Sequence, residues 1–275
     1  MPEDQVAVLA KAGQLLEVMA FRGAQTVVQL SEATGAPRST IYRLLGTLRE
    51  MGWVEEPHNR GHYALGLGLL HLSRAAMDQE VNRRIAMPVL LALRDETQMT
   101  VYLNVLRGLR SVCVERLDGR ILQGHGLRIG GTLPLHAGAG ARVLLAFSGP
   151  ETLERWKQSI LERGQAEAFT TKTPTTAREI DALVSRIRST GVSLSSEDNT
   201  YGIAAVSAPI FAGTDRCVAA VSVGCTPAHL ADVQRRAELT TAVRRAAATI
   251  SDLLAYPVPS LAPRRASPEG TTDID

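Results

Sequence analysis

Apolar residues recur at helical spacing between residues 38 and 51. Ile41, Leu44, Leu45 and Leu48 stand at i, i+3, i+4 and i+7, a pattern that predicts an amphipathic helix with one buried stripe. The opposite face is polar or small and bears two arginines. Its residues are Arg38, Ser39, Thr40, Tyr42, Arg43, Gly46 and Thr47. We therefore expect this helix to pack through its leucines and to present an arginine-bearing face outward.

A tight turn precedes this helix. Gly35 can end a helix in the left-handed conformation, and Pro37 suits the start of a new one because its φ is fixed and it has no N–H to satisfy. Two earlier segments have helical apolar spacing, and a hairpin closes at residues 57–61, where Asn and Gly tolerate positive φ. The apolar positions of the first segment are Val8, Ala12, Leu15, Leu16 and Met19, and those of the second are Val28, Leu30 and Ala33. This order of elements predicts a winged helix-turn-helix.

A winged helix-turn-helix places its second helix in the major groove of double-stranded DNA. The predicted helix is about 21 Å long at ~1.5 Å per residue, and the groove is roughly 12 Å wide, so the N-terminal half of the helix is the reading end. The predicted DNA-binding residues are Arg38, Ser39, Thr40, Tyr42, Arg43 and Thr47 on the helix, and Asn59 and Arg60 in the hairpin. Amphipathicity alone also fits an ordinary surface helix. The combination of helix, turn and hairpin favours DNA binding.

The rest of the chain predicts alternating strands and helices. A helix begins near Asn82 and must restart or kink at Pro88, and two strands joined across Gly108 form an antiparallel hairpin. These strands span residues 100–107 and 111–115. They are followed by a glycine-rich segment and by helices near 140–147, 151–163 and 176–189. Strands at about 203–211 and 217–224 and a long helix at 228–254 complete the domain. Mostly antiparallel strands with helices on their faces give an α+β fold.

The chain resembles the IclR-type bacterial transcriptional regulators. Its segment from Leu133 to Ala146 looks like the family's Leu-Pro-Leu-His-Ala…Gly-Lys-Ala-Leu-Leu-Ala signature, and residues 197–223 are similar to the family's last two core strands. Matches run in the family's order from about residue 7 to residue 254. Two places depart from the pattern: Ala141-Arg142 stands where Gly-Lys is usual, and Val206-Ser207 widens the segment before Ala208-Pro209. Both departures are expected in or beside the effector pocket.

The resemblance implies that the second domain is a GAF-like effector module whose loops cup a small molecule over the sheet. Carried onto this chain, the expected effector-binding residues are Leu122, His125, Ala139, Gly140, Ser195, Ile203, Ala205, Ser222 and Gly224. Backbone N–H groups at a helix start favour an anion. Ser195 and Ser222 can donate hydrogen bonds to the anion, and His125 can add positive charge. We therefore expect the effector to be a carboxylate-bearing metabolite. Simpler roles remain open: Ser222 can bond a neighbouring strand, Ala139 and Gly140 can allow close packing, and His125 can be a surface loop residue.

We expect four segments along the chain: a winged helix-turn-helix at residues 1–66, a linker helix at 67–80, an effector domain at 81–256, and a proline-broken, disordered tail at 257–275. The fold class is an N-terminal all-α winged helix-turn-helix plus an α+β GAF-like domain with an antiparallel sheet. The resemblance implies a ligand-responsive repressor or activator of catabolic or metabolic genes.

The linker is too apolar to be a free segment, since it carries Leu69, Leu70, Leu72 and Ala76. In the family this helix and the first helix pair two DNA-binding domains, and dimers associate further into dimers of dimers. A homodimer predicts a pseudo-palindromic operator whose half-sites lie one turn, about 34 Å, or a multiple apart. Packing within one chain is the alternative.

Net charge is the feature that fits DNA binding least well. The 275 residues carry +2, and residues 1–65 hold six Lys or Arg against seven acids. Phosphate attraction is local, because it is screened beyond ~10 Å at ordinary salt, and Arg38, Arg43 and Arg60 fall on the helix and the hairpin. We expect modest non-specific affinity, with dimerisation supplying the rest.

Neither a metal site nor a catalytic site is predicted. Cys113, Cys217 and Cys225 lie in apolar runs without CxxC spacing, which indicates buried reduced thiols rather than a redox sensor, and His136 is expected to be structural. There is no nucleophile elbow, phosphate loop or HExxH motif, so we expect neither enzyme activity nor a cofactor. The lack of a signal segment and of an apolar run of ~18 residues predicts a cytoplasmic protein without membrane contact. The alternative function is a small-molecule or thiol-based sensor or interaction protein without DNA-binding activity.

Overall fold

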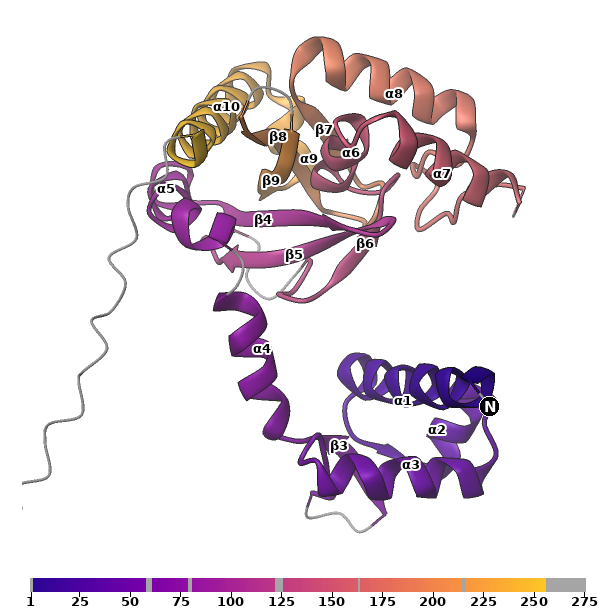
Figure 1. The fold of residues 1–275 in the computed structure, drawn as a ribbon. Coiled ribbons are helices and arrows are strands. Elements are labelled where there is room, and N and C mark those ends of the chain that lie inside the picture. Colours follow the sequence, from indigo (N-terminus) through magenta and orange to yellow (C-terminus); the bar gives the residue numbers. More distant parts are fainter. Residues whose placement is uncertain are drawn as a thin grey trace, which may run out of the picture. The chain divides into compact units, whose positions relative to one another are not determined.

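The computed structural model of the chain describes residues 2–57, 61–78, 81–121, 126–162, 164–213 and 216–255. The chain divides into two compact units, Met1–Gln79 and Glu80–Asp275, each built on a core of its own (Figure 1). Our boundaries at residues 66, 80 and 256 stay predictions. The tail expected from residue 257 lies outside the described residues.

The N-terminal unit is a winged helix-turn-helix followed by a further helix. Its elements are α1 (Pro2–Arg22), β1 (Gln25–Thr26), α2 (Val27–Thr34), α3 (Arg38–Glu50), β2 (Val54–Glu55), β3 (His62–Leu65) and α4 (Gly68–Asp78). Strand β3 lies between β1 and β2 and pairs antiparallel with both. The predicted hairpin is therefore present, and β1 adds a third short strand that the sequence pattern did not predict.

The turn between α2 and α3 is short and braced. Gly35 caps α2 in the left-handed conformation at φ 66°, as predicted, and Pro37 caps the start of α3 rather than filling its first helical position. Across the turn, the Ser31 hydroxyl donates to the Ala36 carbonyl oxygen at 2.7 Å. Thr26 and Gln29 form a capping box at the other end of α2. The Ser31 bond braces the turn that leads into α3, and the capping box fixes the start of α2.

The predicted stripe of α3 is buried as expected. Its four apolar residues join the core of this unit with Leu15 and Met19 of α1. The prediction for α2 was partly wrong, because Val27 and Leu30 are buried whereas Val28 and Ala33 are exposed. The cap at Thr26 starts the helix at Val27, and this places Val28 on the outer face.

Gly66 and Gly68 follow β3 and lie against the backbone of Gly52. A Cβ atom at either position would collide with the Gly52 carbonyl oxygen. We expect Gly66→Ala to lower the free energy of unfolding of the N-terminal unit by about 1–3 kcal/mol, because backbone atoms must move to admit the methyl group. Urea unfolding followed by Trp53 fluorescence, in a Trp156→Phe background, measures this. Gly46→Ala is the control, since nothing lies within 4 Å of its Cβ, and equal stability of the Gly66 variant and its parent would refute the close approach.

The C-terminal unit is an α+β domain. Its elements are α5 (Val81–Thr97), β4 (Thr100–Arg107), β5 (Arg110–Leu117), β6 (Thr132–Pro134), α6 (Ala139–Ala146), α7 (Pro150–Leu161), α8 (Ala177–Thr190), β7 (Ser193–Ser196), β8 (Ala204–Ala212), β9 (Arg216–Cys225), α9 (Pro227–Ala231) and α10 (Val233–Ala255). The strands form one antiparallel sheet in the order β6-β5-β4-β9-β8-β7. The α+β class and the antiparallel sheet are as predicted.

Helices cover both faces of this sheet (Figure 1). On one face, α5 and α10 pack against β4, β8 and β9 around the larger core, which contains Leu103, Val221 and Val243. On the other face, α6 lies on the sheet, with α7 and α8 outside it, around a second core that contains Leu144 and Trp156. The start of α6 is thereby fixed above the middle of the sheet.

Helix α5 runs through Pro88 from Val81 to Thr97, so it does not restart there, and the alternative of a kink at Pro88 stays a prediction. The prediction of one continuous C-terminal helix was wrong. The long C-terminal helix is broken at Asp232, which has extended backbone angles, and the Asp232 carboxylate accepts a bond from the Arg235 N–H at 3.0 Å in the first turn of α10. Within the described ranges, no helix has the length and apolar character needed to span a bilayer.

Candidate functional site

The outer face of α3 is an exposed, arginine-bearing surface. Arg38, Ser39, Arg43 and Thr47 are exposed, and the Tyr42 side chain is 59% exposed. Thr40, also predicted to bind DNA, is half-buried. Among the described residues, no carboxylate lies within ion-pair distance of Arg38 or Arg43. Because the buried stripe and the braced turn fix α3, these groups are presented on a rigid support.

The predicted contacts from the hairpin cannot be placed on this surface. The predicted DNA contacts Asn59 and Arg60 lie outside the described residues. At the other end of α3, Arg49 lies 3.7 Å from the Glu56 carboxylate, so its charge is partly compensated. The uncompensated arginines are thus at the N-terminal half and the middle of α3.

Apolar side chains of α1 and α4 remain exposed in the N-terminal unit. Phe21 of α1 is 91% exposed, and Leu70 and Leu72 of α4 are exposed by 64% and 46%. Helix α4 contains no buried residue among those described. Where exposed apolar side chains form a contiguous patch they mark a surface that binds another protein or an apolar ligand, and these residues are candidates for such a patch.

A cavity of about 80 Å³ lies in the C-terminal unit between the sheet and the start of α6. Side chains and backbone of β4, β5, β8 and β9 form its floor, α6 forms one wall, and the loop at residues 198–203 forms another. Six of the nine predicted effector residues line it: Ala139, Ser195, Ile203, Ala205, Ser222 and Gly224. The structure therefore brings six of the nine residues implied by the resemblance to one cavity.

The other three predicted effector residues are not among the described residues that line the cavity. Leu122 and His125 lie outside the described residues. Gly140 is buried where α6 packs against the sheet, because a Cβ at this position would lie 2.7 Å from Asn104 Nδ2 and 2.9 Å from Ser222 Oγ. Gly140 thus allows α6 to approach the sheet closely, which is the simpler of its two proposed roles. The Ser222 hydroxyl also bonds a neighbouring strand, since it donates to Ser207 Oγ at 2.9 Å.

The first turn of α6 faces the cavity. Gly138 precedes the helix at φ 84° and supplies no side-chain cap, and Ala139 and Ala141 line the cavity. The first N–H groups of a helix have no acceptor within the helix, so this end carries a partial positive charge. The Gly138 N–H itself donates to the Asp198 carboxylate at 3.4 Å.

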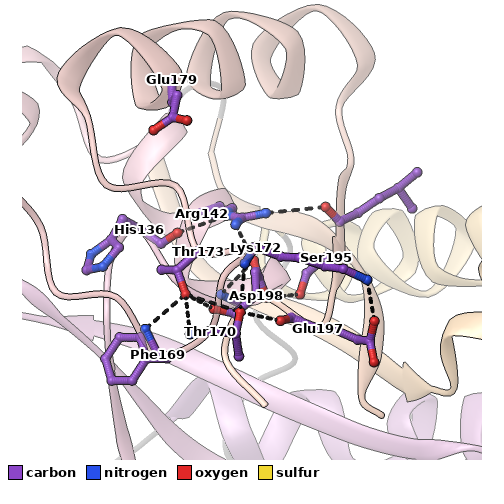
Figure 2. Close-up of polar contacts among 12 residues, drawn as sticks. His136, Arg142, Phe169, Thr170, Lys172, Thr173, Glu179, Ser195, Glu197 and Asp198 are labelled. Carbon is purple, nitrogen blue, oxygen red and sulfur yellow. Dashed lines mark hydrogen bonds and ion pairs between the residues drawn. The ribbon is translucent and has the colours of Figure 1, made fainter. Parts of the chain in front are cut away.

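A buried ion pair closes the wall beside this turn (Figure 2). The Arg142 guanidinium pairs with the Asp198 carboxylate, and both side chains are less than a tenth exposed. Arg142 Nε donates to the His136 carbonyl oxygen at 2.9 Å and the guanidinium also reaches the Leu194 carbonyl oxygen, while Ser195 Oγ donates to Asp198 Oδ1 at 2.6 Å. Burial lowers the pKa of Arg142, and Asp198 opposes that shift. The pair therefore neutralises a carboxylate that lines the cavity.

A second set of bonds ties the loop after β7 to residues 169–173 (Figure 2). Thr170 Oγ1 donates to the Glu197 carbonyl oxygen at 2.6 Å, Thr173 Oγ1 donates to the Asp198 carbonyl oxygen, and the Lys172 ammonium pairs with the Glu197 carboxylate. The loop wall of the cavity is thus held from outside as well as by Arg142.

Sequence reasoning missed the polar floor of the cavity. Tyr102 and Asn104 of β4 and Ser111 of β5 line it, as does Asp198. A signal was present, because Asn104 interrupts an otherwise apolar strand. The face on which it lies became clear only from the pairing of β4 with its neighbours.

Cys113 and Cys225 are buried, as predicted, whereas Cys217 is half-buried. Burial raises the pKa of Cys113, Cys217 and Cys225 to about 12, so these thiols stay protonated and weakly nucleophilic at neutral pH. His136 Nε2 lies 2.8 Å from the Glu167 carbonyl oxygen, and its ring contacts Trp156 and Phe169. Burial lowers the pKa of His136, which favours the neutral imidazole.

Comparison with known proteins gives matches over both units. Residues 75–252 match the family described as "Bacterial transcriptional regulator IclR C-terminal", and residues 8–58 match "IclR helix-turn-helix domain". The HTH-type transcriptional regulator XynR of Escherichia coli is 30% identical over 84% of this chain and 90% of its own. The transcriptional repressor IclR of Escherichia coli is 27% identical over 92% of this chain and 90% of its own.

Solved structures share the fold. A putative transcriptional regulator from Rhodococcus sp. RHA1 matches with a TM-score of 0.73 at 25% identity, covering 90% of this chain and 98% of that chain. An IclR homologue from Microbacterium hydrocarbonoxydans, crystallised in complex with 4-hydroxybenzoate, matches with a TM-score of 0.74 at 24% identity over the same shares of the two chains.

Proposed function

This chain belongs to the IclR family of ligand-responsive, DNA-binding transcriptional regulators, and from that premise we propose which of its surfaces bind DNA, the partner subunit and the effector. The proposal rests on two features: one unit has a rigid arginine face without compensating carboxylates among the described residues, and the other unit has a cavity at the start of a helix. We propose that the protein acts by binding alone and without catalysis, in the cytoplasm where its operator DNA is.

We propose that α3 enters the major groove and that Arg38, Ser39, Thr40, Tyr42, Arg43 and Thr47 contact the operator. Arginine and hydroxyl side chains are suitable for base edges and phosphates. Asn59 and Arg60 complete the surface from the hairpin, with Arg60 on a phosphate. Exposure of this face in the N-terminal unit supports the assignment.

We also propose that the protein is a homodimer, or a dimer of dimers, on a pseudo-palindromic operator. The exposed apolar residues of α1 and α4, among them Phe21 and Leu70, supply surface for pairing two N-terminal units. Two α3 helices related by a two-fold axis fit half-sites about 34 Å apart or a multiple of that distance. Dimerisation then compensates for the low net charge, because two weak contacts act together.

The effector is proposed to be a carboxylate that binds in the cavity against the first turn of α6. Unpaired N–H groups and the helix dipole attract an anion there. Asp198 does not oppose this, since Arg142 and Ser195 already compensate its charge. A fold relative crystallised with 4-hydroxybenzoate, an aromatic carboxylate, agrees with this chemistry.

A thermal-shift titration with aromatic and short-chain organic acids tests the effector proposal. An acid at ~100 times its Kd is expected to add ~2.7 kcal/mol to the free energy of unfolding of the C-terminal unit. The matched control is the neutral amide of the same acid, which has nearly the same shape without the charge and should give no comparable shift. If every acid fails to stabilise the protein, or if amides stabilise it equally, the carboxylate proposal is wrong.

We propose that effector and DNA are coupled through the chain between α3 and α5. Effector binding changes the spacing of the two α3 helices in a dimer, and α4 transmits the change. Linkage requires reciprocity: if the effector weakens DNA binding by some factor, DNA weakens effector binding by the same factor. Measuring effector affinity with and without operator tests this relation for a repressor and an activator alike.

A further inference from the structure

We infer that the effector carries a hydroxyl group in addition to its carboxylate, and that Asn104 and Ser111 recognise this hydroxyl. The inference rests on the proposed carboxylate site and goes beyond it, because it narrows the effector to the hydroxy acids and assigns the side chains that distinguish them from their parent acids.

Two buried polar groups in the floor of the cavity have no partner. Asn104 is 4% exposed and Ser111 is 1% exposed, and in the described structure neither Asn104 Oδ1 nor Ser111 Oγ has a hydrogen-bond partner. Buried polar atoms in native proteins are nearly always bonded, and leaving one unsatisfied is costly. Both residues line the cavity, so a molecule bound there can supply the missing bonds.

The two groups are close enough to meet one small ligand. On the paired strands β4 and β5, Asn104 lies opposite Cys113, and Ser111 is two residues from Cys113 on the same face. Such diagonal neighbours have Cα atoms about 7–8 Å apart. Asn104 also lies directly beneath the first turn of α6, since its amide would touch a Cβ at Gly140. The carboxylate position and the two unpaired groups therefore share one cavity wall and its adjoining floor.

A hydroxyl is the group that best satisfies both residues. It can donate to Asn104 Oδ1 and accept from Ser111 Oγ, whereas a carbonyl can only accept and so cannot satisfy Asn104 Oδ1. An ammonium could donate to both oxygens, but Asp198, the carboxylate among the described lining residues, is already paired with Arg142 and leaves a buried cation without a counter-charge. Because a hydroxyl donates and accepts, it satisfies the Asn104 amide in either orientation of its oxygen and nitrogen.

The rest of the cavity suits a compact carbon skeleton. Leu127, Leu133 and Ile203 line it together with Ala139 and Ala205. These side chains offer apolar contact and no charge. Asp198 also lines the cavity, and Arg142 compensates its charge. The polar floor and the apolar walls together describe a small hydroxylated carboxylic acid, with its carboxylate at α6 and its hydroxyl at the floor.

The test compares acids that differ by one hydroxyl. Isothermal titration calorimetry is run with benzoate and its three monohydroxylated isomers, and with propionate and lactate. With the native chain, at least one hydroxy acid should bind roughly 10-fold to 100-fold more tightly than its parent, because the parent leaves both buried groups unsatisfied. In Ser111→Ala and in Asn104→Leu this preference should fall below about threefold, with the affinity for the parent acid retained.

Ser193→Ala is the matched control. Ser193 is also 1% exposed, and its hydroxyl is likewise unpartnered in the described structure, yet it lines a different surface hollow between α8 and α10. The control should keep the full hydroxyl preference. Neither serine variant removes a described side-chain hydrogen bond, so each should melt at or above the temperature of the native chain, which Trp156 fluorescence reports.

The outcomes separate the two proposals. If neither parent nor hydroxylated acids bind, the carboxylate site itself is wrong. If both classes bind the native chain with equal affinity, ordered water satisfies the floor and the hydroxyl inference is wrong, while the carboxylate site stands. If the preference survives both Ser111→Ala and Asn104→Leu, the hydroxyl is recognised elsewhere and the assignment to these residues is overturned.

Discussion

Replacing Arg142 by methionine is expected to lower the free energy of unfolding of the C-terminal unit by about 3–5 kcal/mol. The variant leaves the Asp198 carboxylate buried, with Ser195 and the Gly138 N–H as its remaining side-chain bonds. It also removes the bonds from Arg142 to the carbonyl oxygens of His136 and Leu194. A buried charge that loses its partner is among the most destabilising single changes in a folded domain.

Urea unfolding measured by Trp156 fluorescence, in a Trp53→Phe background, reports this unit. Arg142→Lys is the matched control, since it keeps the charge but loses the planar set of donors, and it should be destabilised less than Arg142→Met. The double variant Arg142→Met/Asp198→Leu should recover much of the loss, because it removes both charges. An Arg142→Met protein as stable as the native chain would show that the pair does not hold the cavity wall.

The second large effect is expected at the DNA-binding surface. Arg43→Ala should weaken binding to the operator by about 1–3 kcal/mol if Arg43 contacts a base. Arg43 is exposed near the middle of α3, and no described carboxylate compensates its charge. A gel-shift titration on the promoter beside the gene, at fixed salt, measures the change.

Arg49→Ala is the matched control for Arg43→Ala. Arg49 lies on the same helix and bears the same charge, but it is paired with Glu56 near the end of α3. Its substitution should change operator affinity by less than about 0.5 kcal/mol. Equal losses from the two substitutions would indicate a general charge effect, and unchanged binding of the Arg43 variant would exclude Arg43 from the interface.

The part of the fold that could be predicted is the part set by local sequence. The stripe of α3 and the left-handed cap at Gly35 follow from residues within a few positions of each other. Strands β6 and β7 were not predicted, because three or four residues are too few to show alternation. The break at Asp232 was missed for a related reason, since apolar residues continue on both sides of it.

The candidate site, like the fold, has a part that could be predicted from the sequence and a part that could not. Signature positions such as Ala139 and Ser222 could be placed because the resemblance orders them along the chain. The ion pair of Arg142 and the place of Asn104 in the cavity floor could not be predicted, since they depend on which strands and loops meet. Arg142 was expected in or beside the pocket as a departure from the family pattern; its side chain compensates Asp198 instead of lining the cavity.

A photocrosslinker at Tyr42 tests whether the outer face of α3 enters DNA. Tyr42 is 59% exposed on that face, and Phe21 of α1, which is 91% exposed, is the control position. With p-benzoylphenylalanine at each position in turn and the neighbouring promoter as target, we expect base-specific crosslinks from position 42 and none from position 21. A protein that binds the promoter but crosslinks from position 21 and not from position 42 would contradict the account.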